Sequence, residues 1–431
     1  MSLPPGPRSP PLVQVARWIV HPLRLLDDCH RRFGDVFTWR APRIGAFVVV
    51  ADPALIKQVL TADPETLLAG KGNAALLEPM LGKHSMLTLD GADHLRQRRL
   101  LLPAFHGDRM RAYATAMRDI CNASIDTWPT DRPFALHEKM QAITLDVILQ
   151  TVFGDKHGGL REQLVQLLAV ATNPWLLFPG MIGLDPFKIS WLPITKLKRA
   201  VDESLYAMIR DYRRRASGGE DVLSMMIEAR DEQGAPMSDV EIRDELVTLL
   251  LAGHETTATA LAWAFDLLLA NPETLERLQS ELAAGRDEYL DAVIRETLRV
   301  RPIVPLVGRV VAKPFQLGRW LLPVDTRVAP SVYLAGQRAA DYPDPQRFDP
   351  ARWLGVKPDP YTWLPFGGGI RRCIGMAFAQ FEMRIVLETV ATRTHLRPTG
   401  QASRVGRRGI TLAPVGGTVV RLHERPRQRA A

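Results

Sequence analysis

The stretch Phe366-Gly-Gly-Gly-Ile-Arg-Arg-Cys373-Ile-Gly375 stands directly before an apolar segment with helical patterning. A cysteine just ahead of a helix receives backbone N–H groups and the positive end of the helix dipole, and both favour the thiolate. The glycines let the backbone approach a flat ligand, and Arg371 is suited to meet a carboxylate on the rim of that ligand. The stretch therefore predicts a thiolate that binds a metal.

Two simpler interpretations compete with this one. A triple glycine before a helix can cradle a phosphate, but the Lys-Ser/Thr pair of a phosphate-binding loop is absent here. A buried structural cysteine is the commoner role of a lone Cys, but that role requires neither the glycines nor the arginines. The chain has only Cys29, Cys121 and Cys373, and this sparse, odd set argues against disulfides and fits a reducing cytoplasm.

The stretch resembles the haem-binding signature of cytochromes P-450. Phe366, Gly369, Arg371, Cys373 and Gly375 fill every fixed position of the pattern F-x-x-G-x-R-x-C-x-G. The resemblance implies that Cys373 is the proximal ligand of the iron in haem b, and such a thiolate favours O–O cleavage. It also implies the family's fold, which is mainly α with small β-sheets, and a haem buried between a long central helix and the cysteine-ligand helix.

The long central helix is predicted from Ser238 to Ala270. Ser238 and Glu241 form a capping box, and Asn271-Pro272 ends the helix. The apolar run from Leu246 is long enough to cross a bilayer, but charged residues interrupt it. A helix buried in a large domain is therefore favoured, and no transmembrane segment is expected.

Polar residues interrupt this helix at Ala252-Gly-His-Glu-Thr256-Thr257. The zinc pattern H-E-x-x-H fails because position 258 is alanine, and a threonine inside a helix often bonds back to a carbonyl one turn earlier. The stretch also resembles the family's oxygen-activation motif, [AG]-G-x-[DE]-T-[TS]. That resemblance implies that Gly253 lets haem and O₂ approach, that Thr256 hydrogen-bonds the dioxygen and that Glu255 passes protons inward.

An acid and a base three residues apart, Glu296 and Arg299, share one helical face. The pair resembles the family's E-x-x-R, and Arg347 lies where the family keeps a second arginine. The resemblance implies a buried triad of these side chains that locks the cysteine loop. Removing one partner would strand a buried charge.

Basic residues complete the expected haem site. His94 and Arg98 lie on one helical face, and the resemblance implies that they bind the haem propionates together with Arg309 and Arg371. The net charge of +8 is equally typical of a solvated basic surface, and no nucleic-acid partner is expected. An acidic ferredoxin or flavodoxin, supplied with electrons from NAD(P)H by its reductase, is expected to dock on a proximal cluster of arginines. This cluster comprises Arg96, Arg98, Arg99, Arg109, Arg111, Arg371 and Arg372.

The chain of 431 residues is expected to form one catalytic domain over 12–422. A proline-rich segment, 1–11, lacks the apolar core of a signal peptide, so a cytoplasmic location is expected. The basic tail 423–431 is expected to be disordered. The link 281–289 is shorter than is usual in the family, which implies a missing peripheral helix. Further helices are predicted at 95–99, 112–128, 137–153, 160–171, 192–216, 287–300 and 374–392, and strands at 37–40, 47–50, 304–311, 315–322, 327–333 and in a hairpin over 409–422.

The resemblance implies a monooxygenase that inserts one atom of O₂ into a substrate C–H or C=C bond. The sequence resembles a bacterial branch acting on fatty acids, terpenes and steroids, and the segments expected to face the substrate are apolar, so a hydrophobic substrate is expected. A peroxygenase using H₂O₂ and a non-catalytic haem sensor are the alternatives, but neither calls for the Glu255-Thr256 pair. The substrate-facing segments are 76–89, 175–182, 249–252, 303–307 and 410–412, and the expected pocket residues are Leu87, Leu251, Ala252, Val304, Val307 and Thr411.

Overall fold

The computed structural model describes residues 3–42, 44–105, 109–154, 159–171, 193–214, 219, 221–400 and 402–423. The expected substrate-facing segment 175–182 and the tail beyond His423 lie outside these residues. The side chains of Arg109 and Arg111 are outside them too.

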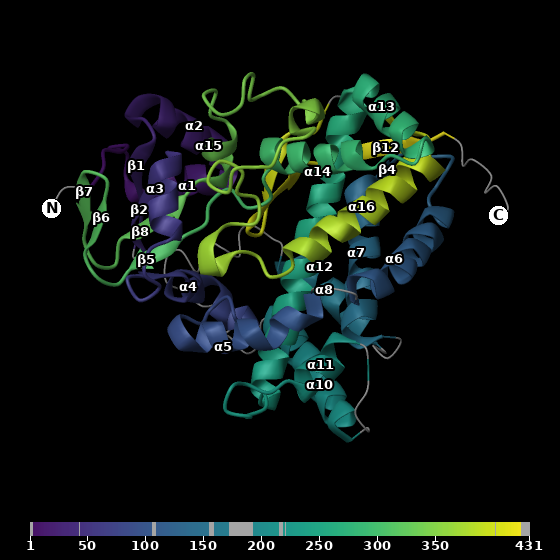
Figure 1. Ribbon diagram of the computed structural model, residues 1–431, viewed down its shortest axis with the longest axis horizontal. Helices are drawn as coiled ribbons and strands as arrows, with labels where there is room; N and C mark the ends of the chain where they lie inside the picture. Colours follow the sequence, from purple (N-terminus) through teal and green to yellow (C-terminus); the bar gives the residue numbers. More distant parts are fainter. Residues whose placement is uncertain are drawn as a thin grey trace.

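Helices make up most of the molecule, and the largest sheet lies at the side where the chain begins (Figure 1). The α-helices are α1 (Pro11–Val20), α2 (Pro22–Phe33), α3 (Pro53–Leu60), α4 (Ala69–Leu81), α5 (Gly91–Leu101), α6 (Arg109–Asp126), α7 (Leu136–Phe153), α8 (Leu160–Ala171), α10 (Pro193–Arg214), α11 (Val222–Glu228), α12 (Asp239–Ala270), α13 (Pro272–Ala283), α14 (Glu288–Val300), α15 (Val332–Gly336) and α16 (Met376–Arg393). Short 3₁₀ helices cover Leu102–Phe105, Pro350–Trp353 and Gly369–Arg371.

The five-stranded sheet has the order β1-β2-β8-β5-β3, in which β2 and β8 run parallel and the other neighbours antiparallel. Smaller sheets are formed by β4-β12-β9, β10-β11 and β6-β7. The strands are β1 (Val36–Ala41), β2 (Gly45–Val50), β3 (Leu67–Leu68), β4 (Phe134–Ala135), β5 (Arg309–Val311), β6 (Phe315–Leu317), β7 (Trp320–Leu322), β8 (Arg327–Pro330), β9 (Leu396–Pro398), β10 (Val405–Arg408), β11 (Thr411–Pro414) and β12 (Val419–Leu422).

Helix α12 runs through the middle of the molecule, with α7 and α16 packed against it (Figure 1). The predicted capping box is confirmed: Ser238 Oγ accepts the Glu241 N–H at 3.3 Å, and Glu241 Oε2 accepts the Ser238 N–H at 2.7 Å. Most residues of the helix are buried, including polar ones such as His254, Glu255 and Asp266. None of the helices in the described ranges, α12 included, has the combination of length and apolar character needed to cross a bilayer.

The strand predictions were less accurate than the helix predictions. The hairpin predicted over 409–422 is wrong, because β11 pairs with β10, whereas β12 pairs with β4 and β9. Gly416 and Gly417 adopt positive φ angles and carry the chain from one sheet to another instead of reversing it within one. The strand predicted at 327–333 stops at Pro330, because Ser331 caps α15 through its hydroxyl group.

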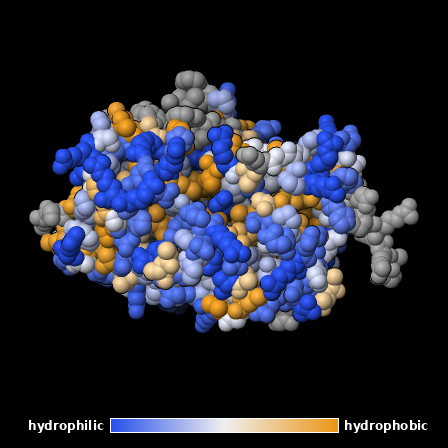
Figure 2. Space-filling view, turned by 90° about the horizontal axis from the view of Figure 1, so that it is seen from above, coloured by the Kyte–Doolittle hydropathy of each residue, from blue (hydrophilic) through white to orange (hydrophobic). Residues whose placement is uncertain are grey.

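Helix α1 packs Val15 and Ile19 onto the first sheet and leaves Leu12, Val13 and Val20 exposed. The face seen from above is mainly hydrophilic, with hydrophobic residues scattered over it in small groups (Figure 2). Scattered exposed apolar residues are normal on a folded protein.

Candidate active site around Cys373

The cysteine loop, residues 366–375, folds back on itself ahead of α16. The Cys373 N–H donates to the Phe366 carbonyl at 2.9 Å, and α16 begins at Met376 with Gly375 as its N-cap. The Cys373 side chain is solvent-accessible, yet burial raises its thiol pKa. The sulfur can therefore be reached by a ligand although protein surrounds most of it. The Gly375 N–H and the charges of nearby arginines oppose this rise, as the dipole argument requires.

The glycines of the loop are needed for its shape. Gly367 and Gly369 have φ angles of 65° and 64°, which side chains rarely tolerate. A Cβ at Gly369 would lie 2.1 Å from the Leu60 carbonyl oxygen, so the loop can lie against the end of α3 only with glycine here. Gly375 has open space at its Cβ position.

Four basic side chains from three separate segments converge beside this loop. They are His94 and Arg98 on α5, Arg309 on β5, and Arg371. Burial lowers the pKa of His94 to about 3, and each of the three arginines contributes to this lowering. Burial and Arg371 also lower the pKa of Arg309, to about 10. Mutual repulsion of this kind means that positive charges have been gathered without enough negative charge to balance them.

One carboxylate lies among these cations. Asp90 accepts hydrogen bonds from Arg371 and from the backbone N–H groups of Gly70 and Lys71. His94 Nδ1 is buried and has no partner among the described residues. A buried polar atom without a partner and a surplus of buried cations are both costly in a folded protein.

The residues present fit a haem. An accessible sulfur at a helix N-terminus is a soft ligand for iron. The surplus cations beside it match the two carboxylates on the rim of a haem, and the unpartnered His94 Nδ1 is a hydrogen-bonding atom for such a group.

The polar stretch of α12 divides between two sides of the helix. Ala252 and Thr256 lie on its accessible strip, whereas His254 and Glu255 are buried against α7. Adjacent residues of a helix do not face each other, which explains why the expected partners Glu255 and Thr256 point in different directions. The Thr256 hydroxyl donates to the Ala252 carbonyl at 2.7 Å, the back-bonding that is usual for a threonine inside a helix.

Glu255 is held by side chains from two neighbouring elements. Its Oε1 accepts from Arg408 Nε at 2.8 Å, and its Oε2 accepts from Gln141 Nε2 at 2.7 Å. Burial raises its pKa, and Arg408 and Gln141 oppose the rise. Both partners, together with His137, also line a solvent-open cavity of about 520 Å³, so Glu255 lies one side chain from bulk water.

Gly253 lies where α12 packs on α7. A Cβ at Gly253 would lie 3.3 Å from Ile148 of α7, so the missing side chain allows α7 and α12 to approach each other. Its neighbour Ala252 is exposed on the accessible strip. The expected role of Gly253 beside haem and O₂ stays a prediction.

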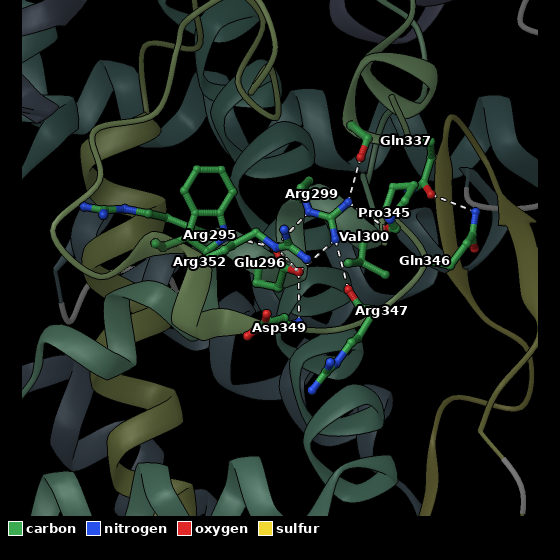
Figure 3. A network of polar contacts seen from close by, with 12 residues as sticks. Arg295, Glu296, Arg299, Val300, Gln337, Pro345, Gln346, Arg347, Asp349 and Arg352 are labelled. Atoms are coloured by element: carbon green, nitrogen blue, oxygen red, sulfur yellow. Dashed lines mark hydrogen bonds and ion pairs between the residues drawn. The ribbon is translucent and has the colours of Figure 1, made fainter. Parts of the chain in front are cut away.

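Glu296 on α14 is the centre of a buried polar network (Figure 3). Arg299 donates to both of its carboxylate oxygens at 2.8 Å, and Arg352 Nε donates to Oε1 at 3.1 Å. Trp353 Nε1 adds a bond of 2.8 Å to Oε2, and the Asp349 N–H adds one of 3.0 Å to Oε1. Five donors therefore satisfy one fully buried carboxylate, as a buried charge requires.

The expected role of Arg347 is wrong. Its side chain is exposed and points away from Glu296, and only its carbonyl oxygen takes part, accepting from Arg299 Nη2 at 3.1 Å (Figure 3). Arg352 is the second arginine of the triad, because the 3₁₀ turn Pro350–Trp353 directs its side chain toward α14. At Arg347, the backbone of the loop faces Arg299 and the side chain faces solvent.

The expected pocket residues meet different surroundings. Ala252 is exposed on the accessible strip, and Leu87, Leu251, Val304 and Val307 are partly accessible. Thr411 differs from these residues. It is buried in the β10–β11 hairpin, where its hydroxyl donates to the Arg408 carbonyl at 2.7 Å.

Two carboxyl groups that sequence reasoning missed hold the loop 82–90. Asp244 Oδ2 accepts the His84 N–H at 3.0 Å, and Glu245 Oε1 accepts the Met86 N–H at 2.7 Å. Burial raises the pKa of Glu245 to about 8, so this carboxyl is protonated at neutral pH. The available signal was a pair of acids in a buried helix, which must find partners elsewhere.

Arg371 fixes the other end of this loop. Its guanidinium donates to the carbonyls of Met86 and Leu89 as well as to Asp90. The loop 82–90 is therefore anchored at one end by α12 and at the other by the cysteine loop.

Among the arginines of the expected proximal cluster whose side chains the structure describes, some are already paired with acidic residues. Arg96 is paired with Asp231 and Glu241, and Arg99 is paired with Glu232. Arg371 is directed inward, as described above. Arg98 and the exposed Arg372 remain near Cys373.

The sequence model of the family described as cytochrome P450 matches residues 4–402. Cytochrome P450 135B1 of Mycobacterium tuberculosis is 40% identical, over 98% of this chain and 92% of its own length. Cytochrome P450 138 of the same organism is 38% identical, over 97% and 96%. The chain therefore belongs to the cytochrome P450 family.

Two solved structures share the fold. One is a cyanobacterial CYP120A1 bound to retinoic acid, with a TM-score of 0.85 and 23% identity, covering 98% of this chain and 99% of its own. The other is the haem domain of cytochrome P450DA, with a TM-score of 0.86 and 23% identity, covering 98% of this chain and 98% of its own. The expected fold class, helix-rich with small sheets, is confirmed. Membership of the family makes the protein a haem-dependent monooxygenase that uses O₂.

Arg352→Met is expected to lower the free energy of unfolding by about 3 kcal/mol, because it removes a charge partner from a buried carboxylate. Arg347→Met is the matched control and should change it by less than about 0.5 kcal/mol, because that side chain is exposed. Urea unfolding followed by tryptophan fluorescence measures both. Equal losses in the two variants would restore Arg347 to the triad.

Proposed function

We propose that this protein oxidises a hydrophobic small molecule with electrons that originate from NAD(P)H and arrive through separate redox proteins. Cys373 would ligate the haem iron, and His94, Arg98, Arg309 and Arg371 would hold the propionates. The observation that carries the proposal is the convergence of four basic groups beside an accessible cysteine sulfur. The haem, once bound to this thiolate, supplies the activation of O₂ for insertion into a C–H or C=C bond.

Glu255 and Thr256 of α12 would supply protons and a hydrogen bond on the opposite side of the haem from Cys373. Glu255 stands between the solvent-open cavity and the interior, so protonation from water requires only that Arg408 or Gln141 shift. The Thr256 hydroxyl can exchange its bond to the Ala252 carbonyl for a bond to an oxygen-containing ligand. Because Glu255 and Thr256 point in different directions, a rotation of the carboxyl group or a bridging water must connect them.

The substrate class follows from the residues on the accessible side of α12 and the segments beside it. Leu87, Leu251, Ala252, Val304 and Val307 are apolar and at least partly accessible. An apolar lining binds by removing apolar surface from water, which favours a lipid or terpenoid. Lys83 and His84 are the basic residues of the loop 82–90, and they could hold a carboxylate at the end of such a molecule.

The redox partner would meet the surface behind Cys373. Arg98 and Arg372 are cations near the sulfur, and Ile370 of the cysteine loop is exposed. A small positive surface with an apolar centre suits an acidic ferredoxin or flavodoxin, because charge steers the encounter and apolar contact supports the complex.

The ligand assignment predicts the spectrum of the reduced protein with CO. Wild type is expected to show the red-shifted Soret band of thiolate ligation, and Cys373→His should lose it while still binding haem. The reduced CO-difference spectrum is the measurement. A wild-type protein that binds haem without the red-shifted band would refute the assignment of Cys373.

The substrate class predicts which compounds would change the spin state of the haem-loaded protein. Fatty acids, terpenoids and steroids should convert the resting protein from low to high spin, because they fill an apolar hollow. Polar compounds of similar size serve as controls, and absorbance titration is the measurement. A spin shift with the polar set alone would exclude a hydrophobic substrate.

Arg408→Gln is expected to move the pH dependence of coupled turnover to higher pH. Arg408 stabilises the charged form of Glu255, so its loss raises the Glu255 pKa further and keeps the carboxyl protonated at a higher pH. Product formed per NAD(P)H consumed, measured against pH, would therefore decline later than in wild type. Arg404→Gln, an exposed site just before β10, controls for the lost charge. Identical profiles for the two variants would exclude Glu255 as the titrating donor.

A further inference from the structure

Four aromatic side chains form a continuous series that starts at the cysteine loop. The ring centroids of Phe366 and Trp363 are 6.1 Å apart, those of Trp363 and Trp353 are 6.2 Å apart, and those of Trp353 and Tyr342 are 5.9 Å apart. Phe366 is joined to Cys373 by the backbone hydrogen bond of 2.9 Å. The series therefore connects the residue proposed to bind the iron with the loop around Glu296.

The polar atoms of these rings all have acceptors. Trp363 Nε1 donates to the Arg295 carbonyl at 3.1 Å, and Trp353 Nε1 donates to the Glu296 carboxylate at 2.8 Å. The Tyr342 hydroxyl donates to Thr362 Oγ1 at 3.2 Å. An acceptor on an indole N–H stabilises positive charge on that ring, and an acceptor on a phenol gives its proton a place to go.

Two arginines lie beside the series, and both are paired with the same carboxylate. Arg299 lies over the Tyr342 ring at 5.0 Å, and both Arg299 and Arg352 are bound to Glu296. The Glu296 carboxylate also accepts the Trp353 indole N–H at 2.8 Å. Its negative charge therefore acts directly on the Trp353 ring, where it favours positive charge on that ring.

The far end of the series lies directly below the surface. Trp353 is 3% exposed and Tyr342 is 6% exposed, but the chain neighbours of Tyr342, Asp341 and Pro343, are exposed. A small reductant in solution can therefore come within a side chain's thickness of the last ring.

Tryptophan and tyrosine are among the side chains that lose one electron most easily, whereas phenylalanine does not. From the cysteine loop outward, the order is one phenylalanine, two tryptophans and one tyrosine. Phe366 is not oxidised itself and only lies between the cysteine loop and Trp363. The other three rings can each be oxidised and re-reduced in turn. These rings do not carry the electrons of ordinary catalysis, because they take up no electron from a biological reductant.

We propose that Trp363, Trp353 and Tyr342 form an electron relay that re-reduces the haem site when hydrogen peroxide oxidises it in the absence of substrate. The proposal rests on the haem being bound at Cys373. It gives the protein a second, protective activity: the reduction of peroxide by small soluble reductants such as ascorbate.

Each passage through the relay moves one electron inward. Peroxide withdraws two electrons from the haem site. Trp363 would then give one electron to the haem site and be refilled by Trp353. Tyr342 would refill Trp353 as its phenolic proton passes to Thr362 Oγ1 and the hydroxyl proton of Thr362, which is partly accessible, passes to water. Ascorbate returns an electron and a proton to Tyr342. Two passages restore the resting state, so one H₂O₂ and two ascorbate molecules give two waters and two ascorbyl radicals.

The experiment uses the purified ferric holoprotein with hydrogen peroxide and no substrate. Rapid-freeze electron paramagnetic resonance detects ring radicals, mass spectrometry maps oxidised side chains, and absorbance follows haem bleaching and ascorbate consumption. In wild type, oxidised products should concentrate at positions 342, 353 and 363. In Trp363→Phe, products at 353 and 342 should disappear, bleaching should be severalfold faster and ascorbate consumption severalfold slower.

A second variant separates electron transfer from packing. Tyr342→Phe keeps the ring over which Arg299 lies and removes only the hydroxyl, so the radical signal should shift from tyrosine to tryptophan character and ascorbate consumption should fall. Trp128→Phe is the matched control, because Trp128 is 1% exposed and packs against Phe134 at a tilt of 55°, outside the series. It should behave as wild type in every readout.

Two outcomes would overturn the relay. One is oxidation at Trp128 as extensive as at Trp353 and Trp363 in wild type, and the other is an unchanged bleaching rate in Trp363→Phe. Every variant is first required to show the CO spectrum of thiolate ligation. A protein that fails this requirement counts against the haem site, whereas a protein that meets it and lacks the expected products counts against the relay alone.

Discussion

The carboxylate of Glu296 is the constraint on which the proximal half of the molecule depends. It is fully buried and accepts hydrogen bonds from two guanidinium groups, an indole and a backbone N–H. A buried charge is tolerated only when it is completely satisfied, so the loop that supplies these donors has a single acceptable path. Arg299 also binds the carbonyls of Gly336 and Pro345, which fixes the backbone on both sides. Trp353 packs against Trp363, and Trp363 packs against Phe366, so these contacts connect the loop around Glu296 to the cysteine loop.

Helical geometry is the second constraint, and it decides which residues of α12 can cooperate. Residues 254 and 255 face α7, while 252 and 256 face the accessible side. The buried acid thereby lies one side chain from the solvent-open cavity, whereas the hydroxyl lies on the accessible strip. This separation lets the buried Glu255 keep its ion pair with the partly exposed Arg408 away from Thr256.

Helices and the cysteine loop could be predicted from the sequence because their signals are local. The capping box at Ser238, the apolar run of α12 and the glycines around Cys373 depend on neighbouring residues only. The pairing of β11 and β12 could not be predicted, because partners far away in sequence decide it. Arg352 was missed for the same reason. Arg347 and Arg352 are both plausible partners for Glu296 in the sequence, and only the path of the folded loop makes one side chain point inward and the other outward.

Arg371 ties two parts of the site that are usually treated as separate. The same guanidinium holds the carbonyls of Met86 and Leu89 and lies among the cations suited to the haem rim. The loop proposed to line the substrate side and the group proposed to anchor the cofactor therefore share one side chain. If both proposals hold, an engineer who redesigns residues 82–90 for a new substrate also changes the surroundings of the haem propionates, so selectivity and cofactor retention have to be optimised together.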